Sequence, residues 1–262
     1  MNLPVFFKFV ILSFIFFMSP IFANPKQIHF AYQNTNNYPF QTGKGETTDW
    51  EKPGILIEMF SILEKKLNIQ IIYSRFPWKR SLFELKSGKV DGLFEASFKQ
   101  KRLVYGQYPQ RSGKIDESRR TNYNSYYLYT RKNSKVFWDG TNIKNIPKGI
   151  CAEREYSIVD DLQKKGHVVH EFNATAKCME LLSNGRVDAV AALELAANSI
   201  VRKNYKQFNN IKILQPALKT KVYYLMLSHQ FVKKYPKLSE KIWDTVKQIR
   251  ESKEMKVIYS KY

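Results

Sequence analysis

A chain of 262 residues is long enough for one large domain or two small ones. Its formal net charge is +20, but the Lys and Arg residues are scattered over the whole length. Because they form no block of the kind that marks a nucleic-acid-binding arm, we expect a basic surface and no nucleic-acid partner. An anionic ligand or an acidic envelope surface is the alternative explanation of this charge.

The first 23 residues are predicted to be a secretory signal peptide. Lys8 supplies the positive charge, residues 9–17 are nearly all apolar, Pro20 breaks the run, and Ala23 is a small residue before a cleavage point. An uncleaved membrane anchor is the alternative, but the run is short of the ~20 residues that span a bilayer. With no cysteine near Ala23 and no later apolar stretch of sufficient length, we expect an exported, periplasmic protein. Its mature net charge is +19, since Lys8 is the one charged residue removed.

Residues 28–96 alternate between strand and helix patterns. Ile28, Phe30 and Tyr32 alternate with other residues, as in a half-buried strand, and apolar residues between Leu56 and Leu67 lie on one helical face. The predicted elements are a strand at 28–32, a loop at 41–53, a helix at 56–67, a strand at 69–73, a helix at 77–88 and a strand at 90–96. This order implies parallel pairing with right-handed crossovers.

The pattern Leu-x-x-Gly-[Lys/Arg]-Val-Asp occurs twice, at residues 85–91 and 182–188. Each copy predicts a helix that ends at a glycine, which suits the left-handed conformation, followed directly by a short apolar strand. Two copies, with Gly88 and Gly185 separated by 97 positions, suggest two α/β lobes of similar build. Domain interfaces are favoured ligand sites, so we expect a binding cleft between the lobes.

Two β-prone runs, residues 125–130 and 222–227, are predicted to be paired strands that carry the chain out to the second lobe and back. Residues 110–124, which are charged and polar, are expected to form a surface loop. The second lobe is predicted to contain strands at 149–152, 168–172 and 187–193 and a helix at 174–183, and an amphipathic helix at 238–249 precedes a short tail, 255–262. A single three-layer domain is the alternative, but it leaves the repeat and the twin runs as coincidences.

Cys151 and Cys178 are the only cysteines. An even number of cysteines in an oxidising compartment permits a disulfide, which would close a loop of 26 intervening residues. Two buried free thiols are the alternative.

Several segments resemble one known family through their order and spacing. They are Tyr38-Pro39-Phe40, the segment Gly54-Ile55-Leu56-Ile57-Glu58-Met59, Trp78 with Leu82 and Leu85 before Gly-Lys-Val-Asp, the second copy Gly-Arg-Val-Asp-Ala-Val at 185–190, and a terminal helix ending in Ile258-Tyr259. Together they resemble the bacterial extracellular solute-binding proteins of family 3, the polar amino acid-binding type. The resemblance covers residues 28–262.

The resemblance implies an α/β, two-lobe periplasmic binding protein fold of type II with two crossover hinge strands. Lobe 1 would begin with residues 24–126, lobe 2 would comprise 127–221, and 222–262 would supply the return hinge strand and helices that pack on lobe 1. It implies a monomer that captures a small polar solute, amino acid-like or carboxylate-bearing, for an ABC-type permease of the inner membrane. No cofactor or metal is implied.

In this family an arginine after the first Val-Asp strand binds the ligand carboxylate, and Arg102 occupies that position. A planar guanidinium can bind a carboxylate bidentately. Ser97 matches a hydroxyl position of the family, whereas Lys99 replaces the usual threonine. The alternative for Arg102 and its lysine neighbours is a solvated basic turn.

Trp78 matches the aromatic wall that packs against the ligand, because an aromatic face offers contact area and can hold a cation. Core packing is the alternative for Trp78, as it is for Tyr38 and Phe40. Arg80 faces either the cleft or solvent.

From lobe 2, the resemblance implies a turn that meets the ligand at a helix start. Here the turn reads Glu153-Arg154-Glu155-Tyr156-Ser157 without a glycine, so side chains should enter the cleft, and Glu153, Tyr156 and Ser157 are the candidates. The acidic residue that takes an α-ammonium falls at Leu193, and we expect Glu194, one residue later, to replace it.

An enzyme and a sensor are the alternative functions. No nucleophile-elbow, zinc, Walker or dinucleotide fingerprint is present. The fold is nevertheless similar to that of periplasmic cyclohexadienyl dehydratases, in which Glu153, Glu155 or Glu194 near Arg102 would serve as an acid. A sensor would dock on a membrane receptor instead of a permease. We expect binding without catalysis.

Overall fold

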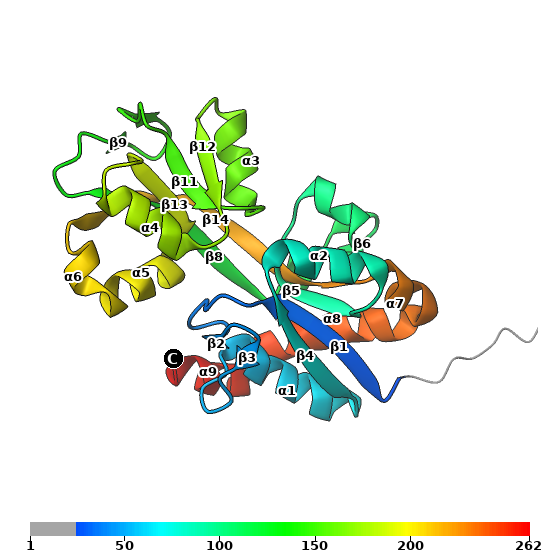
Figure 1. The fold of residues 1–262 in the computed structure, drawn as a ribbon. Coiled ribbons are helices and arrows are strands. Elements are labelled where there is room, and N and C mark those ends of the chain that lie inside the picture. Colours follow the sequence, from blue (N-terminus) through cyan, green and yellow to red (C-terminus); the bar gives the residue numbers. More distant parts are fainter. Residues whose placement is uncertain (1–24) are drawn as a thin grey trace, which may run out of the picture.

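The computed structural model describes residues 25–262, and the predicted signal peptide lies outside the described residues. They fold into two α/β lobes connected by two long strands (Figure 1). Among the helices of the described residues, none has the length and apolar character needed to cross a membrane.

Eight strands form one sheet that runs through both lobes. Their bounds are β1 Gln27–Gln33, β4 Gln70–Phe76, β5 Gly92–Ser97, β8 Asn122–Arg131, β11 Ile150–Glu153, β12 Val169–Phe172, β13 Ala189–Leu193 and β14 Ile211–Leu227. The order across the sheet is β12-β11-β13-β8-β14-β5-β1-β4. In lobe 1, β1 pairs in parallel with β4 and β5, and in lobe 2, β11 pairs in parallel with β12 and β13, as the alternation of strands and helices predicts.

The two crossing strands are β8 and β14, which contain the twin β-prone runs. They pair antiparallel in two stretches, from Ile211 opposite Arg131 to Leu214 opposite Leu128, and again from Lys219 opposite Tyr126. On its other side, β8 pairs antiparallel with β13 of lobe 2, whereas β14 pairs antiparallel with β5 of lobe 1. The prediction that the two runs are paired crossover strands is confirmed, although β14, with 17 residues, is longer than expected.

Helices cover the sheet of lobe 1. They are α1 Ile55–Leu67, α2 Trp78–Ser87, α7 His229–Lys234, α8 Pro236–Arg250 and α9 Lys253–Ser260. Phe30, Phe60 and Trp243 are fully buried in the core between β1, α1 and α8. Burial of each such side chain contributes roughly 1.5–3 kcal/mol.

The helix ends of lobe 1 follow the sequence closely. α1 ends at Asn68 with φ 51°, and α2 ends at Gly88 with φ 74°, both in the left-handed region. In lobe 2 the equivalent left-handed residue is Gly185, with φ 69°, one position after the cap residue Asn184.

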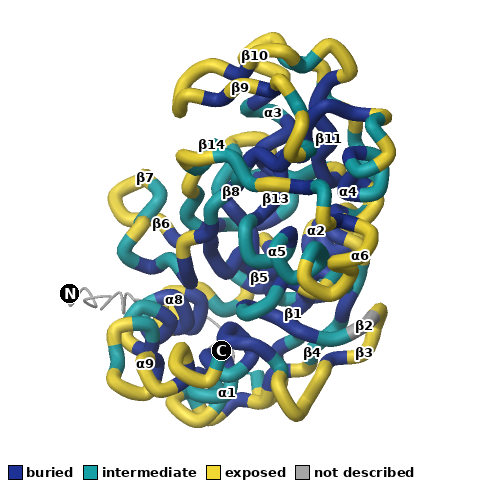
Figure 2. Tube along the Cα trace, turned by 90° about the vertical axis from the view of Figure 1, so that its left-hand side faces the viewer, coloured by how far each residue is buried: buried dark blue, intermediate teal, exposed yellow. Residues whose placement is uncertain are grey.

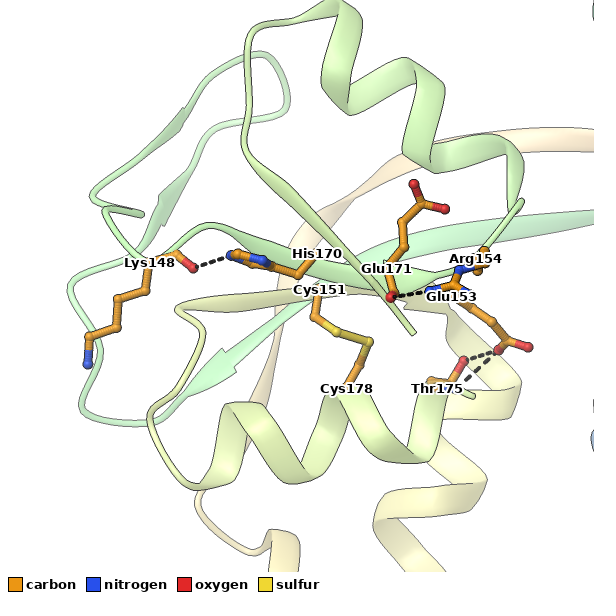
Figure 3. Close-up of a disulfide and its surroundings, with 8 residues drawn as sticks. All are labelled: Lys148, Cys151, Glu153, Arg154, His170, Glu171, Thr175 and Cys178. Carbon is orange, nitrogen blue, oxygen red and sulfur yellow. Dashed lines mark hydrogen bonds between the residues drawn. A yellow bond between two sulfur atoms is a disulfide. The ribbon is translucent and has the colours of Figure 1, made fainter. Parts of the chain in front are cut away.

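Lobe 2 contains α3 Ser157–Lys164, α4 Thr175–Ser183, α5 Glu194–Lys203 and α6 Tyr205–Phe208. Cys151 on β11 and Cys178 on α4 form a disulfide, with their Cα atoms 5.5 Å apart (Figure 3). Both residues are fully buried, so the bridge ties α4 to the sheet from inside the core.

Three expectations about irregular segments need correction. The segment 110–124 is not a simple loop, because it includes the start of β8 and buried Arg119, Thr121 and Asn122. The loop at 41–53 contains a small hairpin, and the tail from Met255 is part of α9. The charged residues of this segment led to the loop prediction, but Arg119 is buried because it forms ion pairs with residues of α8, far along the chain.

Short hairpins lie at the edges of the molecule. They are β2–β3 (Gly43–Lys44, Thr47–Thr48), β6–β7 (Gln110–Arg111, Lys114–Ile115) and β9–β10 (Phe137–Trp138, Ile143–Lys144). The strands β5, β11 and β13 of the central sheet are buried, whereas much of these outer hairpins is exposed (Figure 2).

Candidate functional site

A pocket lies between the two lobes, with about 310 Å³ of space that no atom fills, open solvent included. Its walls come from both lobes and both crossing strands. The lining residues are Gln33, Asn37, Gln41, Trp78, Glu95, Ser97 and Arg102 of lobe 1, Tyr156, Ser157 and Leu193 of lobe 2, and Tyr126 and Tyr223 of β8 and β14. The pocket brings together five of the ten predicted ligand contacts.

Arg102 is buried against the pocket and is held on several sides. Its Nη1 donates to the backbone oxygen of Ser97 at 2.8 Å and to the Ser97 hydroxyl at 3.0 Å. Its Nη2 donates across the cleft to the backbone oxygen of Glu155 at 2.7 Å. The guanidinium carbon lies 5.1 Å from the centre of the Trp78 ring. These contacts fix the orientation of the guanidinium, which hydrogen-bonds to residues of both lobes.

Trp78 lies in the core of lobe 1 and also lines the pocket. Pro77 precedes it as the cap of α2, and the Trp78 ring packs with Leu82 and Leu85 in the core. The same ring lines the pocket, and its buried Nε1 has no hydrogen-bond partner among the described residues. A buried donor without a partner is costly, so a ligand acceptor is its natural complement.

The turn after β11 brings lobe 2 against lobe 1. Glu153 accepts hydrogen bonds from the backbone nitrogen and hydroxyl of Thr175, at 3.1 and 2.7 Å (Figure 3), and also from Gln33 of lobe 1. The Tyr156 hydroxyl donates to the amide oxygen of Gln33 at 2.7 Å. Burial raises the pKa of Glu153 to about 7, although hydrogen bonds from Thr175 and Gln33 lower it. Glu153 thus contacts the pocket through Gln33.

Glu155 in this turn has a left-handed φ of 62°, the conformation that glycine adopts most easily. The turn therefore keeps the backbone geometry of a glycine turn without a glycine. This geometry presents the Glu155 carbonyl to Arg102.

Glu95 on β5 is a pocket residue that the sequence patterns do not single out. It is 7% exposed, has φ 60°, and accepts a hydrogen bond from the Asn37 amide nitrogen at 3.0 Å. Burial raises the pKa of Glu95 to about 7, although the amides of Asn122, Asn37 and Asn124 lower it. The one available signal was a charged residue inside an otherwise apolar strand.

Two predicted aromatic contacts lie outside the pocket. The Tyr38 hydroxyl donates to the backbone oxygen of Tyr262, and the two rings lie near one another. Phe40 is packed in the core of lobe 1. For Phe40, core packing is therefore the interpretation that the structure supports.

Arg80 and Glu194 also lie outside the pocket. Arg80 is 58% exposed on α2 and pairs with Glu84 on the same helix at 3.3 Å. Glu194 begins α5, and Leu193 lines the pocket instead. The offset of one residue matters because adjacent residues at a strand end point to different sides.

Lys99, which stands where the family has a threonine, forms ion pairs between the two lobes. The Lys99 ammonium of lobe 1 lies 2.7 Å from Asp161 and 3.4 Å from Asp160 of α3 in lobe 2, and Lys101 lies 2.8 Å from Asp160. Lys221 of β14 also pairs with Asp161. We call these five residues the cleft ion-pair network. Burial lowers the pKa of Lys221 to about 8 despite its pairing with Asp161, while Lys221 and Lys99 hold the pKa of Asp161 down against the effect of burial.

We expect the cleft ion-pair network to favour lobe closure. Asp161→Asn removes the anion shared by Lys99 and Lys221, so the ratio of open to closed ligand-free protein should rise about fivefold, because such partly exposed pairs contribute about 1 kcal/mol. Small-angle X-ray scattering at low salt should give a larger radius of gyration for the variant. High salt should bring the original protein toward the variant, because salt screens exposed charges.

Glu180→Gln is the matched control, because it removes a charge from the Lys177–Glu180 pair within α4. This variant should scatter like the original protein. Equal radii of gyration for all three proteins at low salt would contradict a role of the network in closure.

A model of the bacterial extracellular solute-binding proteins, family 3, matches residues 29–262. The chain belongs to this family. A search of curated protein sequences gives no match.

Solved structures with the same fold cover nearly the whole chain. A histidine kinase sensor domain with similarity to periplasmic binding proteins has a TM-score of 0.72 at 15% identity, covering 91% of this chain and 96% of the other. An ancestral arginine-binding protein bound to glutamine has a TM-score of 0.70 at 17% identity, with coverages of 92% and 99%. The arginine-, lysine-, histidine-binding protein ArtJ from the thermophilic bacterium Geobacillus stearothermophilus has 0.69 at 17%, with 90% and 95%. These likenesses establish the periplasmic binding protein fold predicted from the sequence.

No group of three or more His, Cys, Asp or Glu side chains within residues 25–262 is arranged to hold a metal ion.

Proposed function

We propose that this member of the family is a periplasmic binding protein that captures a small amino acid-like solute between its lobes and closes over it. The observation that carries the proposal is a pocket lined from both lobes with five buried polar atoms that have no hydrogen-bond partner among residues 25–262, on Asn37, Gln41, Trp78, Glu95 and Ser157. Buried polar groups are nearly always hydrogen-bonded, so these atoms favour a polar ligand.

The named ligands of similar structures support an amino acid-like solute. One such structure is an arginine-binding protein with glutamine bound, and another binds arginine, lysine and histidine. Here Arg102 would bind a carboxylate of the solute, with Ser97 holding the guanidinium and Trp78 packing beside it. Delivery to an ABC-type permease would follow hinge closure.

Sensing is the second candidate, because a histidine kinase sensor domain shares the fold over 91% of this chain. Both candidates require solute capture and differ in the membrane partner. A pull-down of the ligand-bound protein with membranes would separate them, since transport predicts a permease and sensing predicts a receptor kinase. Turnover of prephenate or arogenate would instead support the enzyme alternative.

A thermal-shift screen against amino acids, oligopeptides, polyamines and organic acids tests solute capture, because a ligand that binds only the folded state raises the melting temperature. For the solute found, Arg102→Ala should weaken binding about 10- to 100-fold, the usual loss for a hydrogen bond to a charged group. Isothermal titration calorimetry measures the change.

Arg111→Ala is the control, since Arg111 is 64% exposed and lies outside the pocket. It should bind as the original protein does. Unchanged affinity in the Arg102 variant would contradict its anchoring role, and the lack of any stabilising solute would count against solute capture.

A further inference from the structure

Three side-chain oxygen atoms on pocket residues of lobe 1 accept no hydrogen bond from the part of the chain that the structure describes. They are Oδ1 of Asn37, Oε1 of Gln41 and Oε1 of Glu95, and all three residues are less than 10% exposed. They form one continuous wall, because Asn37 donates to Glu95 and the backbones of Asn37 and Gln41 hydrogen-bond to each other. We call these three atoms the acceptor wall.

The orientations of the two amides are set by what their nitrogen atoms bind. Asn37 Nδ2 donates to the other carboxylate oxygen of Glu95 at 3.0 Å. Gln41 Nε2 donates to the backbone oxygen of Gln33 at 3.1 Å. Turning either amide around would place an oxygen against an acceptor, so both oxygens are left facing the pocket as acceptors.

Arg102, the cationic residue that lines the pocket, donates no hydrogen bond to the acceptor wall. Arg102 already donates to Ser97 and to the Glu155 carbonyl. Glu153, the other buried carboxylate nearby, also has its own donors in Thr175 and Gln33. Among the described residues, Oε1 of Glu95 therefore has no hydrogen-bond partner of good geometry and no cation bound to it, although the amides of Asn122 and Asn124 lie near enough to lower the pKa of the carboxyl. Amides partly stabilise a buried carboxylate, and a cationic ligand would neutralise its charge.

Two unusual backbone conformations place the acceptor wall in the pocket. Glu95 has φ 60°, a left-handed conformation that a non-glycine residue rarely adopts. Gly54, with φ 104°, lets the Gln41 backbone approach, because a Cβ on Gly54 would lie 2.6 Å from the Cα of Gln41. Strained positions of this kind persist where the surroundings require them, and they gather at ligand sites.

We infer that Glu95, with Asn37 and Gln41, is the subsite of lobe 1 that binds a cationic nitrogen of the solute, an ammonium or a guanidinium group. This inference rests on the proposed solute-binding function and assigns the cation to lobe 1. Several N–H donors on one positive group would satisfy all three acceptors at once. The Trp78 Nε1 donor and Arg102 face the same pocket, so the solute also carries an acceptor group away from the cation.

Calorimetric titration with matched probes tests the subsite. The probes are L-lysine with its partners L-norleucine and 6-aminohexanoate, each lacking one ammonium, L-arginine with L-citrulline, cadaverine, and the anion succinate. At least one cationic probe should bind, and the partner that lacks the recognised charge should bind about 10- to 100-fold more weakly. Glu95→Gln should weaken the cationic probe by a similar factor and leave the weaker partner unchanged.

Glu95→Gly is the second variant, because glycine accepts the left-handed φ and removes the buried carboxyl. It should remain folded, as a cooperative melting transition would show, and still lose the preference for the cation. Glu254→Gln, at an exposed position on α9, is the control for loss of one negative charge and should keep the preference.

The outcomes separate this inference from the proposed function. Binding of succinate or another uncharged or anionic solute, with lobe closure seen by scattering and no cationic probe bound, would overturn the cation subsite and leave solute capture standing. Equal binding of a cationic probe by the original protein and both Glu95 variants would also overturn it. If no solute of any class binds, both proposals fail.

Discussion

Raising the pH from about 5 to about 8 should lower the free energy of unfolding of the ligand-free protein by several kcal/mol. Burial raises the pKa of both Glu95 and Glu153 to about 7, above the ordinary value of 4.5. In this range the folded protein holds protons that the unfolded chain has released, so stability falls as pH rises. The stabilisation of the protonated form is fully present below pH 4.5 and is lost as pH passes about 7. Each carboxyl contributes on the order of 3 kcal/mol.

Chemical denaturation of the original protein and of Glu95→Gln at several pH values measures this effect. The variant cannot ionise at position 95, so its stability should decline about half as much across the same range. The pKa of His167 is lowered by burial and by Lys165, which opposes the trend, but this contribution is common to both proteins and cancels in their difference. Parallel pH profiles for the two proteins would show that Glu95 does not titrate there.

Reduction of the Cys151–Cys178 disulfide should destabilise the protein by about 3 kcal/mol. The bridge joins residues 27 positions apart, and opening a loop of that size restores freedom to the unfolded chain. For a protein of this size the melting temperature should fall by roughly 10 °C. Melting curves with and without a reductant test this.

Cys151→Ala with Cys178→Ala provides the control. The double variant should melt below the oxidised protein, and the reductant should not change its melting temperature. Two free thiols in the unfolded, unreduced protein, as measured by Ellman titration, would be incompatible with the bridge.

The proposed cation subsite predicts that ligand binding and the stability of the empty protein respond to pH in opposite directions. A cationic nitrogen binds the ionised carboxylate, so acidification below about pH 7 would weaken a cation held by Glu95 while it stabilises the empty protein. The buried carboxyl therefore lowers the stability of the ligand-free protein at neutral pH, where its ionised form is the one that would bind a cation.

Much of the fold could be predicted from local patterns in the sequence. Helical spacing and the left-handed residues Asn68 and Gly88 mark helices and their ends, because these properties depend on neighbouring residues alone. The twin β-prone runs were correctly paired as β8 and β14. Recognition of the family depended on the order of such local segments along the chain.

The pocket depended on contacts that no local pattern contains. Glu95 lies within an apolar strand and meets Asn37, 58 positions earlier, and Lys99 meets Asp161, 62 positions later in the other lobe. Glu194 lies one residue beyond Leu193, and that single step at the end of β13 takes its side chain away from the pocket. The sequence by itself determined two lobes, their helices and their crossing strands, since periodicity and turn chemistry act over a few residues. Only the tertiary structure decided which charges the cleft encloses, because that depends on how the two lobes close on one another.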